Sequence, residues 1–167
     1  RDAGCNARLP RAQVLPSAQT DALLAEQAHL MRVVAPFLAA LSRAAGPARH
    51  AAMLTDGRGH LLAVVGDQET LADENFPRPG ALLSESASGA NGVGTALAEN
   101  AYVELVGPEH YVEGFHPFTC QGVPLAGPSG VEGIVSMSVR RLETADRVRD
   151  ILFCASKAAE SELLAHW

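Results

Sequence analysis

The stretch from Ser84 to Cys120 constrains the fold of this chain more than any other part of it. Its glycines and small polar residues predict a tight turn that leads into a short helix, and two strand-like runs rich in His and aromatic residues follow. Several glycines, several potential hydrogen-bond donors and little net charge are typical of a segment that lines a site. The turn consists of Gly89, Asn91, Gly92, Gly94 and Thr95.

A helix is predicted over residues 19–46, after an extended lead-in of residues 1–18. Pro36 lies inside the helical pattern, where it removes a backbone donor and predicts a kink or break near Val34. An apolar stripe along the helix must be buried, either against the chain's own domain or against a second copy of the helix. The stripe consists of Leu30, Val34, Phe37 and Leu41.

Strand-like patterns lie between residues 48 and 142. A hairpin is predicted first, followed by a connection with a short helix and then by two further strands joined by a Gly-Pro-Ser-Gly turn. A final helix over residues 144–166 completes an α/β order with antiparallel neighbours, which predicts a sheet with helices on both sides. The four strands are residues 51–56, 60–67, 119–125 and 131–140.

The last of these strands has one unusually polar face. Side chains alternate between the two faces of a strand, so Glu132, Ile134, Ser136 and Ser138 share one of them. This face is either exposed to solvent or the floor of a polar cavity.

Composition excludes several classes of function. The chain has 167 residues, enough for one domain, and a net charge of −6, which disfavours contact with nucleic acid. No apolar run approaches the roughly 20 residues that span a bilayer, and no signal peptide is recognisable, so we expect a cytoplasmic protein without membrane contact. The cysteines Cys5, Cys120 and Cys154 are too far apart for a CxxC zinc site and odd in number for a disulfide framework.

The glycine-rich turn does not match a phosphate-binding motif. Gly92-Val93-Gly94 lacks the third glycine of the dinucleotide fingerprint, and no Gly-Lys-Ser/Thr completes a P-loop. The helix that follows could hold a carboxylate or carbonyl oxygen of a small ligand at its N-terminus. Alternatively, the glycines serve only the turn.

The segment PEHYVEGFHPFTC gathers six residues with possible functional chemistry. His110 and His116 are separated by a Glu-Gly turn instead of sharing a helix face, which disfavours a metal or haem site. Cys120 could form a catalytic pair with His116. Aromatic residues with a few polar tips are typical of a pocket for a small, partly apolar molecule.

The strings SESASGANGVGTAL, LVGPEHY, FHPFTCQGVPL and VEGIVSMSV resemble the GAF domain at the N-terminus of acetoin-catabolism-type, sigma-54-dependent transcriptional activators. The resemblance covers nearly the whole chain. It implies a single GAF domain over residues 19–167, with a GAF/PAS-like antiparallel sheet of five to six strands. The terminal helices lie on one face of this sheet, and a pocket helix and loops lie on the other.

The function implied by this resemblance is that of a sensor that binds a small organic effector and controls a transcriptional activator. Ala90, Phe118 and Gln121 depart from the family pattern, so the resemblance does not identify the effector as acetoin. We expect a ketone, alcohol, aldehyde or aromatic acid. No catalytic residue, metal or cofactor is expected, and the terminal helices would form a homodimer. The alternatives are a GAF-fold thiol enzyme or redox sensor acting through Cys120, and a covalent tetrapyrrole at that residue.

The expected effector-binding residues come mainly from the stretch described first. Asn91 and Thr95 would supply hydrogen bonds at the helix start, and Phe115 and Phe118 would supply apolar walls. The full set is Glu85, Asn91, Thr95, His110, Tyr111, Phe115, His116, Phe118, Cys120, Gln121 and Ser136.

Overall fold

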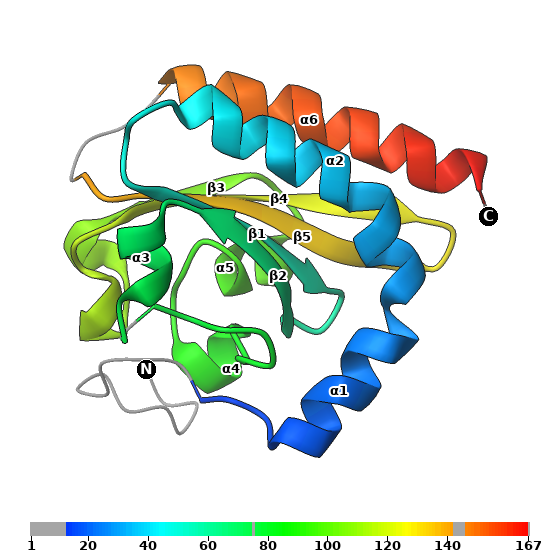
Figure 1. Ribbon diagram of the computed structural model, residues 1–167, viewed down its shortest axis with the longest axis horizontal. Coiled ribbons are helices and arrows are strands. Elements are labelled where there is room, and N and C mark those ends of the chain that lie inside the picture. Colours follow the sequence, from blue (N-terminus) through cyan, green and yellow to red (C-terminus); the bar gives the residue numbers. More distant parts are fainter. Residues whose placement is uncertain (1–12, 75, 142–145, 167) are drawn as a thin grey trace.

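A five-stranded antiparallel sheet forms the centre of the computed structural model, which describes residues 13–74, 76–141 and 146–166 (Figure 1). The strand order is β2-β1-β5-β4-β3, so β5 lies in the middle and pairs with β1 and β4. The α/β class and the antiparallel sheet predicted from the sequence are therefore confirmed. The strands are β1 (His50–Asp56), β2 (Leu61–Gly66), β3 (Val103–Val106), β4 (Thr119–Gly127) and β5 (Gly130–Val139).

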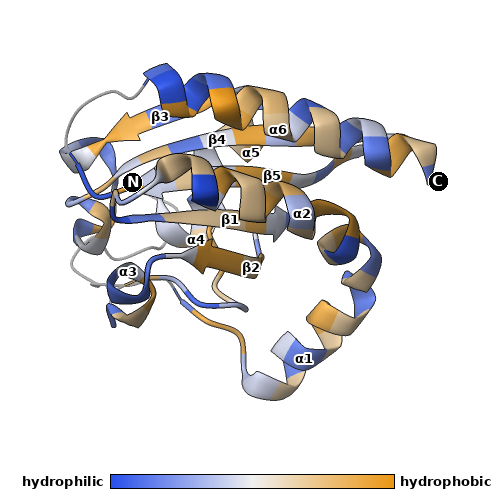
Figure 2. Ribbon diagram, turned by 45° about the horizontal axis from the view of Figure 1, so that its top comes forward, coloured by the Kyte–Doolittle hydropathy of each residue, from blue (hydrophilic) through white to orange (hydrophobic). Residues whose placement is uncertain are grey.

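Helices α2 (Ala28–Ala45) and α6 (Asp146–Ala165) lie side by side across one face of the sheet (Figure 1). Hydrophobic and hydrophilic residues alternate along both helices (Figure 2), and their apolar sides are buried against β1, β4 and β5. Leu30, Val34 and Leu41 of the predicted stripe belong to this core. The stripe thus packs on the chain's own domain, as the first of the two alternatives predicted.

The N-terminal helical region is divided at a different point from the one predicted. α1 (Ser17–Glu26) is separated from α2 by Gln27, and α2 continues through Pro36 without the break expected near Val34. Pro36 and Arg32 are both exposed, so water can reach the Arg32 carbonyl that Pro36 leaves without a donor. The predicted lead-in of residues 1–18 is shorter than expected, because α1 already begins at Ser17. Its first twelve residues lie outside the described part of the chain.

The packing of α6 gives a direct test of this helical layer. Leu163 is 1% exposed and its neighbour Leu164 is 54% exposed. Leu163→Ala is expected to lower the free energy of unfolding by about 2–3 kcal/mol, because it removes buried methyl groups and leaves a cavity. Leu164→Ala is expected to change it by less than about 0.5 kcal/mol. Urea denaturation of the two variants measures the difference, and equal effects would contradict this docking of α6.

Short helices and loops cover the opposite face of the sheet. They include α3 (Gln68–Ala72), α4 (Glu85–Ser88), α5 (Gly94–Glu99) and the 3-10 turns η1 (Gly107–Glu109) and η2 (Glu113–Phe115). A second apolar core lies between them and the sheet, with Met53, Phe76 and Phe118 among its members. None of the helices described is long and apolar enough to cross a membrane.

One prediction for the central stretch is wrong. Only one strand, β3, follows the short helix α5 before β4 begins, and the chain around His110 forms η1 and η2 instead of a second strand. Pro108 and Pro117 bracket this segment, and proline cannot donate to a sheet ladder. Gly107 enters the segment with a φ of 52°, a conformation that ends an extended strand.

Candidate functional site

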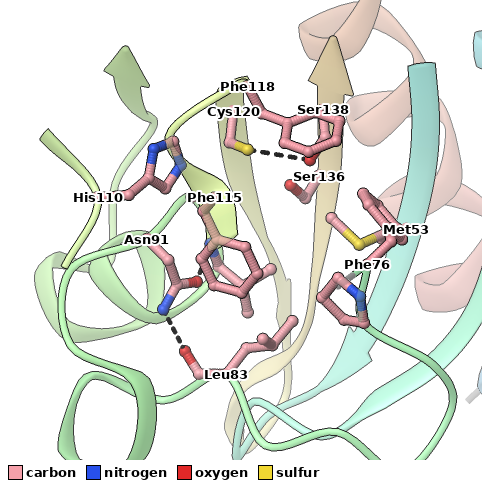
Figure 3. A pocket seen from close by; sticks show the side chains of 13 residues that line it. Met53, Phe76, Leu83, Asn91, His110, Phe115, Phe118, Cys120, Ser136 and Ser138 are labelled. Carbon is pink, nitrogen blue, oxygen red and sulfur yellow. Dashed lines mark hydrogen bonds between the residues drawn. The ribbon is translucent and has the colours of Figure 1, made fainter. Parts of the chain in front are cut away.

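A small pocket lies between the sheet and the glycine-rich turn (Figure 3). β5 contributes Ser136 and Ser138 to it, and β1 and β4 contribute Met53 and Cys120. Ser136 and Ser138 are 0% and 1% exposed, so this part of the polar strand face is the floor of a cavity, whereas Glu132 at the start of the strand is partly exposed and lies outside the pocket. The remaining wall residues are Phe76, Pro77, Leu83, Asn91, Gly92, Val93, His110, Phe115 and Phe118.

The free space in this pocket is small. The volume open to the centre of a water molecule is ≈ 20 Å³, which accommodates about one water. Any molecule of several carbon atoms must therefore displace side chains of the wall. Because interiors are close-packed, such a displacement extends to the elements behind the wall.

Asn91 holds the glycine-rich turn in place. Its Nδ2 donates to the carbonyl oxygens of Leu83 (2.7 Å) and Gly89 (2.9 Å). Its Oδ1 accepts from the backbone N–H groups of Val93 (3.0 Å) and Gly94 (2.9 Å), at the start of α5. The N–H groups expected to be free for a ligand are therefore already bonded, and Asn91 contributes a wall surface whose polar atoms are paired.

Two glycines allow the turn to approach the sheet closely. Gly92 lies in the turn and Gly122 lies in β4 beneath it. A Cβ at Gly122 would overlap the carbonyl oxygen of Gly92 and would lie 3.1 Å from the Cβ of Ala96. These glycines thus serve close backbone contact, which agrees with the alternative that they are needed for the turn itself.

His110 presents an unpaired nitrogen to the pocket. Its Nδ1 donates to the carbonyl oxygen of Gly107 at 2.9 Å, and its buried Nε2 has no hydrogen-bond partner. Since a carbonyl oxygen can only accept, Nδ1 carries the proton and Nε2 carries the lone pair. Burial lowers the pKa of His110, which keeps the ring neutral. The edge-to-face contact with Phe115, at 5.9 Å between ring centroids, fixes the ring in the wall.

The hydroxyl of Ser136 is the second unpaired polar group in the pocket. It is buried, and its Oγ has no hydrogen-bond partner. Its neighbour Ser138 differs in this respect, because its Oγ lies 3.0 Å from the Sγ of Cys120. A buried polar atom without a partner is unusual in a folded protein and calls for an explanation.

Cys120 is a protonated thiol in this environment. Burial raises the pKa of Cys120 to about 12, although the contact with Ser138 lowers it in part. His116, the base considered for a catalytic pair, instead donates from Nε2 to the carbonyl oxygen of His110 at 3.0 Å. The arrangement therefore lacks the thiolate that nucleophilic or redox chemistry requires.

Thiol labelling checks this assignment. Iodoacetamide at pH 8 is expected to modify Cys154, which is exposed, and to leave Cys120 unmodified in the folded protein. Mass spectrometry of peptides locates the label, and urea-unfolded protein serves as the positive control for Cys120. Modification of Cys120 at the rate of Cys154 in the native state would contradict a buried, protonated thiol.

Five of the residues predicted for the site lie outside the pocket. Glu85, Tyr111 and His116 line a separate, open surface groove, in which His110 also takes part. The Thr95 hydroxyl donates to the Glu85 carboxylate at 2.7 Å. Gln121 pairs with Met137 of the helix-facing core and donates to Glu104 at 2.6 Å, so it lies on the opposite face of the sheet.

The pocket brings together the other six predicted residues, namely Asn91, His110, Phe115, Phe118, Cys120 and Ser136. Ser138 was not predicted, although its alternation with Ser136 places it on the same strand face. Met53 and Leu83 carried no comparable signal in the sequence. Among the described residues, no group of three or more His, Cys, Asp and Glu side chains is arranged to hold a metal ion.

Comparison with known proteins identifies relatives among transcriptional regulators. The family model described as MimR, N-terminal domain, matches residues 16–164. The acetoin dehydrogenase operon transcriptional activator AcoR of Bacillus subtilis is 29% identical over 157 residues, which cover 92% of this chain and 26% of AcoR. The chain spans about a quarter of the length of the curated relatives AcoR and MimR.

Solved structures agree on the fold. The Escherichia coli DhaR(N)–DhaL complex contains a chain that superposes with a TM-score of 0.85 at 14% identity, over 93% of this chain and 55% of that one. The GAF-B domain of DevS from Mycobacterium smegmatis superposes with a TM-score of 0.53 at 19% identity, over 82% and 95%. The resemblance to GAF domains of acetoin-catabolism-type activators is therefore confirmed, and this chain belongs to the MimR N-terminal domain family.

Proposed function

We propose that this chain is a regulatory sensor domain, spanning residues 19–167, that binds a small organic effector in the pocket beneath the glycine-rich turn. The observation that carries the proposal is a small, mostly apolar pocket that contains two unpaired polar atoms, in a relative of transcriptional activators. Apolar walls with a few polar groups are typical of small-molecule sites. The effector would control a transcriptional activator acting in the cytoplasm.

The central strand offers a route from the pocket to the helices. Ser136 and Ser138 of β5 line the pocket, whereas Val135, Met137 and Val139 alternate with them and pack against α2 and α6. An effector larger than the free space would push on β5 and thereby bias the position of the helical layer. Binding free energy is then coupled to the arrangement of the two helices, which is the requirement for allosteric signalling.

A thermal-shift screen tests the proposal. Small ketones, alcohols, aldehydes and aromatic acids are added to the purified chain, and a ligand at 100 times its dissociation constant stabilises the fold by about 2.7 kcal/mol. For a domain of this size the melting temperature then rises by about 5–10 °C. The absence of any shift across all four classes would contradict the sensor function.

Two variants distinguish the pocket from the open groove. Ser136→Leu fills the pocket and is expected to abolish the shift. Glu113→Gln alters an exposed groove residue and is expected to leave the shift unchanged. The opposite result would indicate that the effector binds in the open groove and not in the pocket.

A homodimer through the terminal helices is part of the same proposal. Since the apolar stripe of α2 is buried in the chain's own core, the dimer would use the outer surface of the helical layer, where Phe153 and Leu164 are 39% and 54% exposed. Light scattering over a range of concentrations, with Leu164→Glu as the disrupting variant, measures this association. A mass that stays monomeric at all concentrations would contradict it.

A further inference from the structure

The unpaired atoms of the pocket carry information about the chemistry of the effector. The Nε2 of His110 and the Oγ of Ser136 are both buried and both lack a partner. They belong to separate elements, the segment between η1 and η2 and the strand β5, and they line the same space (Figure 3). Each can be paired by one molecule placed between them.

His110 requires a donor. The bond from Nδ1–H to the Gly107 carbonyl fixes the tautomer, so Nε2 offers only a lone pair. A hydroxyl group can donate to this nitrogen. A ketone, an aldehyde or an ether has acceptor oxygens only and would place two lone pairs against each other.

The Ser136 hydroxyl can pair with either a donor or an acceptor of the ligand. A serine hydroxyl donates or accepts, so it can pair with the same hydroxyl or with a second oxygen of the ligand. Its neighbours Ser138 and Cys120 contact each other at 3.0 Å, which leaves Ser136 as the group facing the ligand from the floor.

The pocket also selects against charge. None of its lining residues is acidic, and none is Lys or Arg. A carboxylate buried here would lose its hydration without an opposite charge or a set of N–H donors to replace it. The N–H groups of Val93 and Gly94, at the start of α5, are already bonded to Asn91.

We propose that the effector is a small, uncharged alcohol or diol, whose hydroxyl donates to Nε2 of His110 and whose oxygen atoms also pair with the Ser136 hydroxyl. This rests on the proposed function and narrows it. The free space of ≈ 20 Å³ sets a small size, and Met53, Phe76 and Phe115 contact the carbon skeleton. Simple ketones, aldehydes and aromatic acids are excluded as good ligands.

Matched probes test the proposal in the intact chain. Calorimetry and thermal shift compare 2-butanol with 2-butanone, and benzyl alcohol with benzaldehyde and benzoate. Each alcohol is expected to bind at least about tenfold more tightly than its carbonyl counterpart, because only the alcohol pairs the buried acceptor. Benzoate is expected not to bind.

Two variants test whether the preference for alcohols over ketones depends on the Nε2 of His110 and the Oγ of Ser136. His110→Phe keeps a ring against Phe115 but removes the acceptor, and Ser136→Ala removes the floor hydroxyl. Both are expected to reduce the alcohol-to-ketone ratio of affinities toward one. Ser156→Ala is the matched control, because Ser156 is also buried with an unpaired Oγ but lies on α6, on the other side of the sheet.

A second measurement covers the case in which His110→Phe fails to fold. The imidazole ¹⁵N signals of His110 in the unchanged chain should move at Nε2 when 2-butanol is added, and not when 2-butanone is added. Equal affinity for alcohols and ketones overturns the alcohol proposal but leaves the sensor function in place. Absence of binding by every probe also overturns it, and the wider screen then decides whether the sensor function stands.

Discussion

Replacement of Gly122 by alanine is expected to lower the free energy of unfolding by about 3–4 kcal/mol. A Cβ at this position would overlap the carbonyl oxygen of Gly92 and approach Ala96 at 3.1 Å. The Gly92 oxygen belongs to the backbone, and the Ala96 Cβ has no rotatable bond that could move it away, so the glycine-rich turn and α5 would have to lift from β4. Overpacking costs about 1–3 kcal/mol and occasionally more, and the fixed position of the Gly92 oxygen puts Gly122→Ala at the upper end of this range.

Urea denaturation and melting temperature measure this effect, and the melting temperature should fall by about 10 °C. Gly46→Ala is the control, because Gly46 has a φ of 63° but nothing lies within 4 Å of its Cβ position. It measures the cost of alanine at a positive φ without any clash, which is about 1–3 kcal/mol at this backbone conformation (ψ −136°). A Gly122→Ala protein no less stable than the control would show that the turn does not rest on the sheet as described.

Asn91→Ala is expected to be at least as damaging, with a loss of about 4 kcal/mol. The amide forms hydrogen bonds with four backbone groups, and its removal leaves the N–H groups of Val93 and Gly94 without an acceptor in a buried position. Each unsatisfied buried group costs about 1–3 kcal/mol. The glycine-rich turn is expected to open before the sheet unfolds, because α2 and α6 pack on the opposite face of the sheet and do not depend on Asn91.

Two further substitutions test whether the loss of stability comes from the hydrogen bonds of the Asn91 amide. Asn91→Asp keeps an acceptor for Val93 and Gly94 but places an oxygen against the carbonyls of Leu83 and Gly89, so it should also be strongly destabilising. Asn100→Gly is the control, because Asn100 is exposed with a φ of 49°, where glycine is at least as suitable. Hydrogen exchange at Val93 and Gly94 reports on the turn directly. Unchanged protection of these amides in Asn91→Ala would contradict the role given to the side chain.

The sheet and its helical layer followed from the sequence because their patterns are local. The stripe of α2 and the alternation of β5 depend on residues close together in the chain, and these periods are read without knowing the tertiary structure. The alternation of β5 does not itself distinguish a solvent-exposed face from a cavity floor, because that depends on the burial of Ser136 by distant segments.

The pocket was predicted less completely, for reasons that concern long-range contacts. Whether Asn91 faces a ligand or its own backbone depends on where Leu83 and Gly89 lie, which composition does not reveal. The face on which Gln121 points depends on the register between β4 and β5. The turns η1 and η2 replaced an expected strand because two prolines and a left-handed glycine outweighed the apolar pattern.

The two sides of the pocket, β5 on one side and the η1–η2 segment on the other, should tolerate change to different degrees. Ser136 is on a strand paired on both sides, with its alternate residues packed against α2 and α6, so a bulkier side chain there disturbs the output helices together with the cavity. Phe115, in η2, is outside the sheet ladder. For the construction of a biosensor from this chain, mutant libraries directed at η1 and η2 should therefore yield responsive proteins with altered effector preference more often than libraries directed at β5.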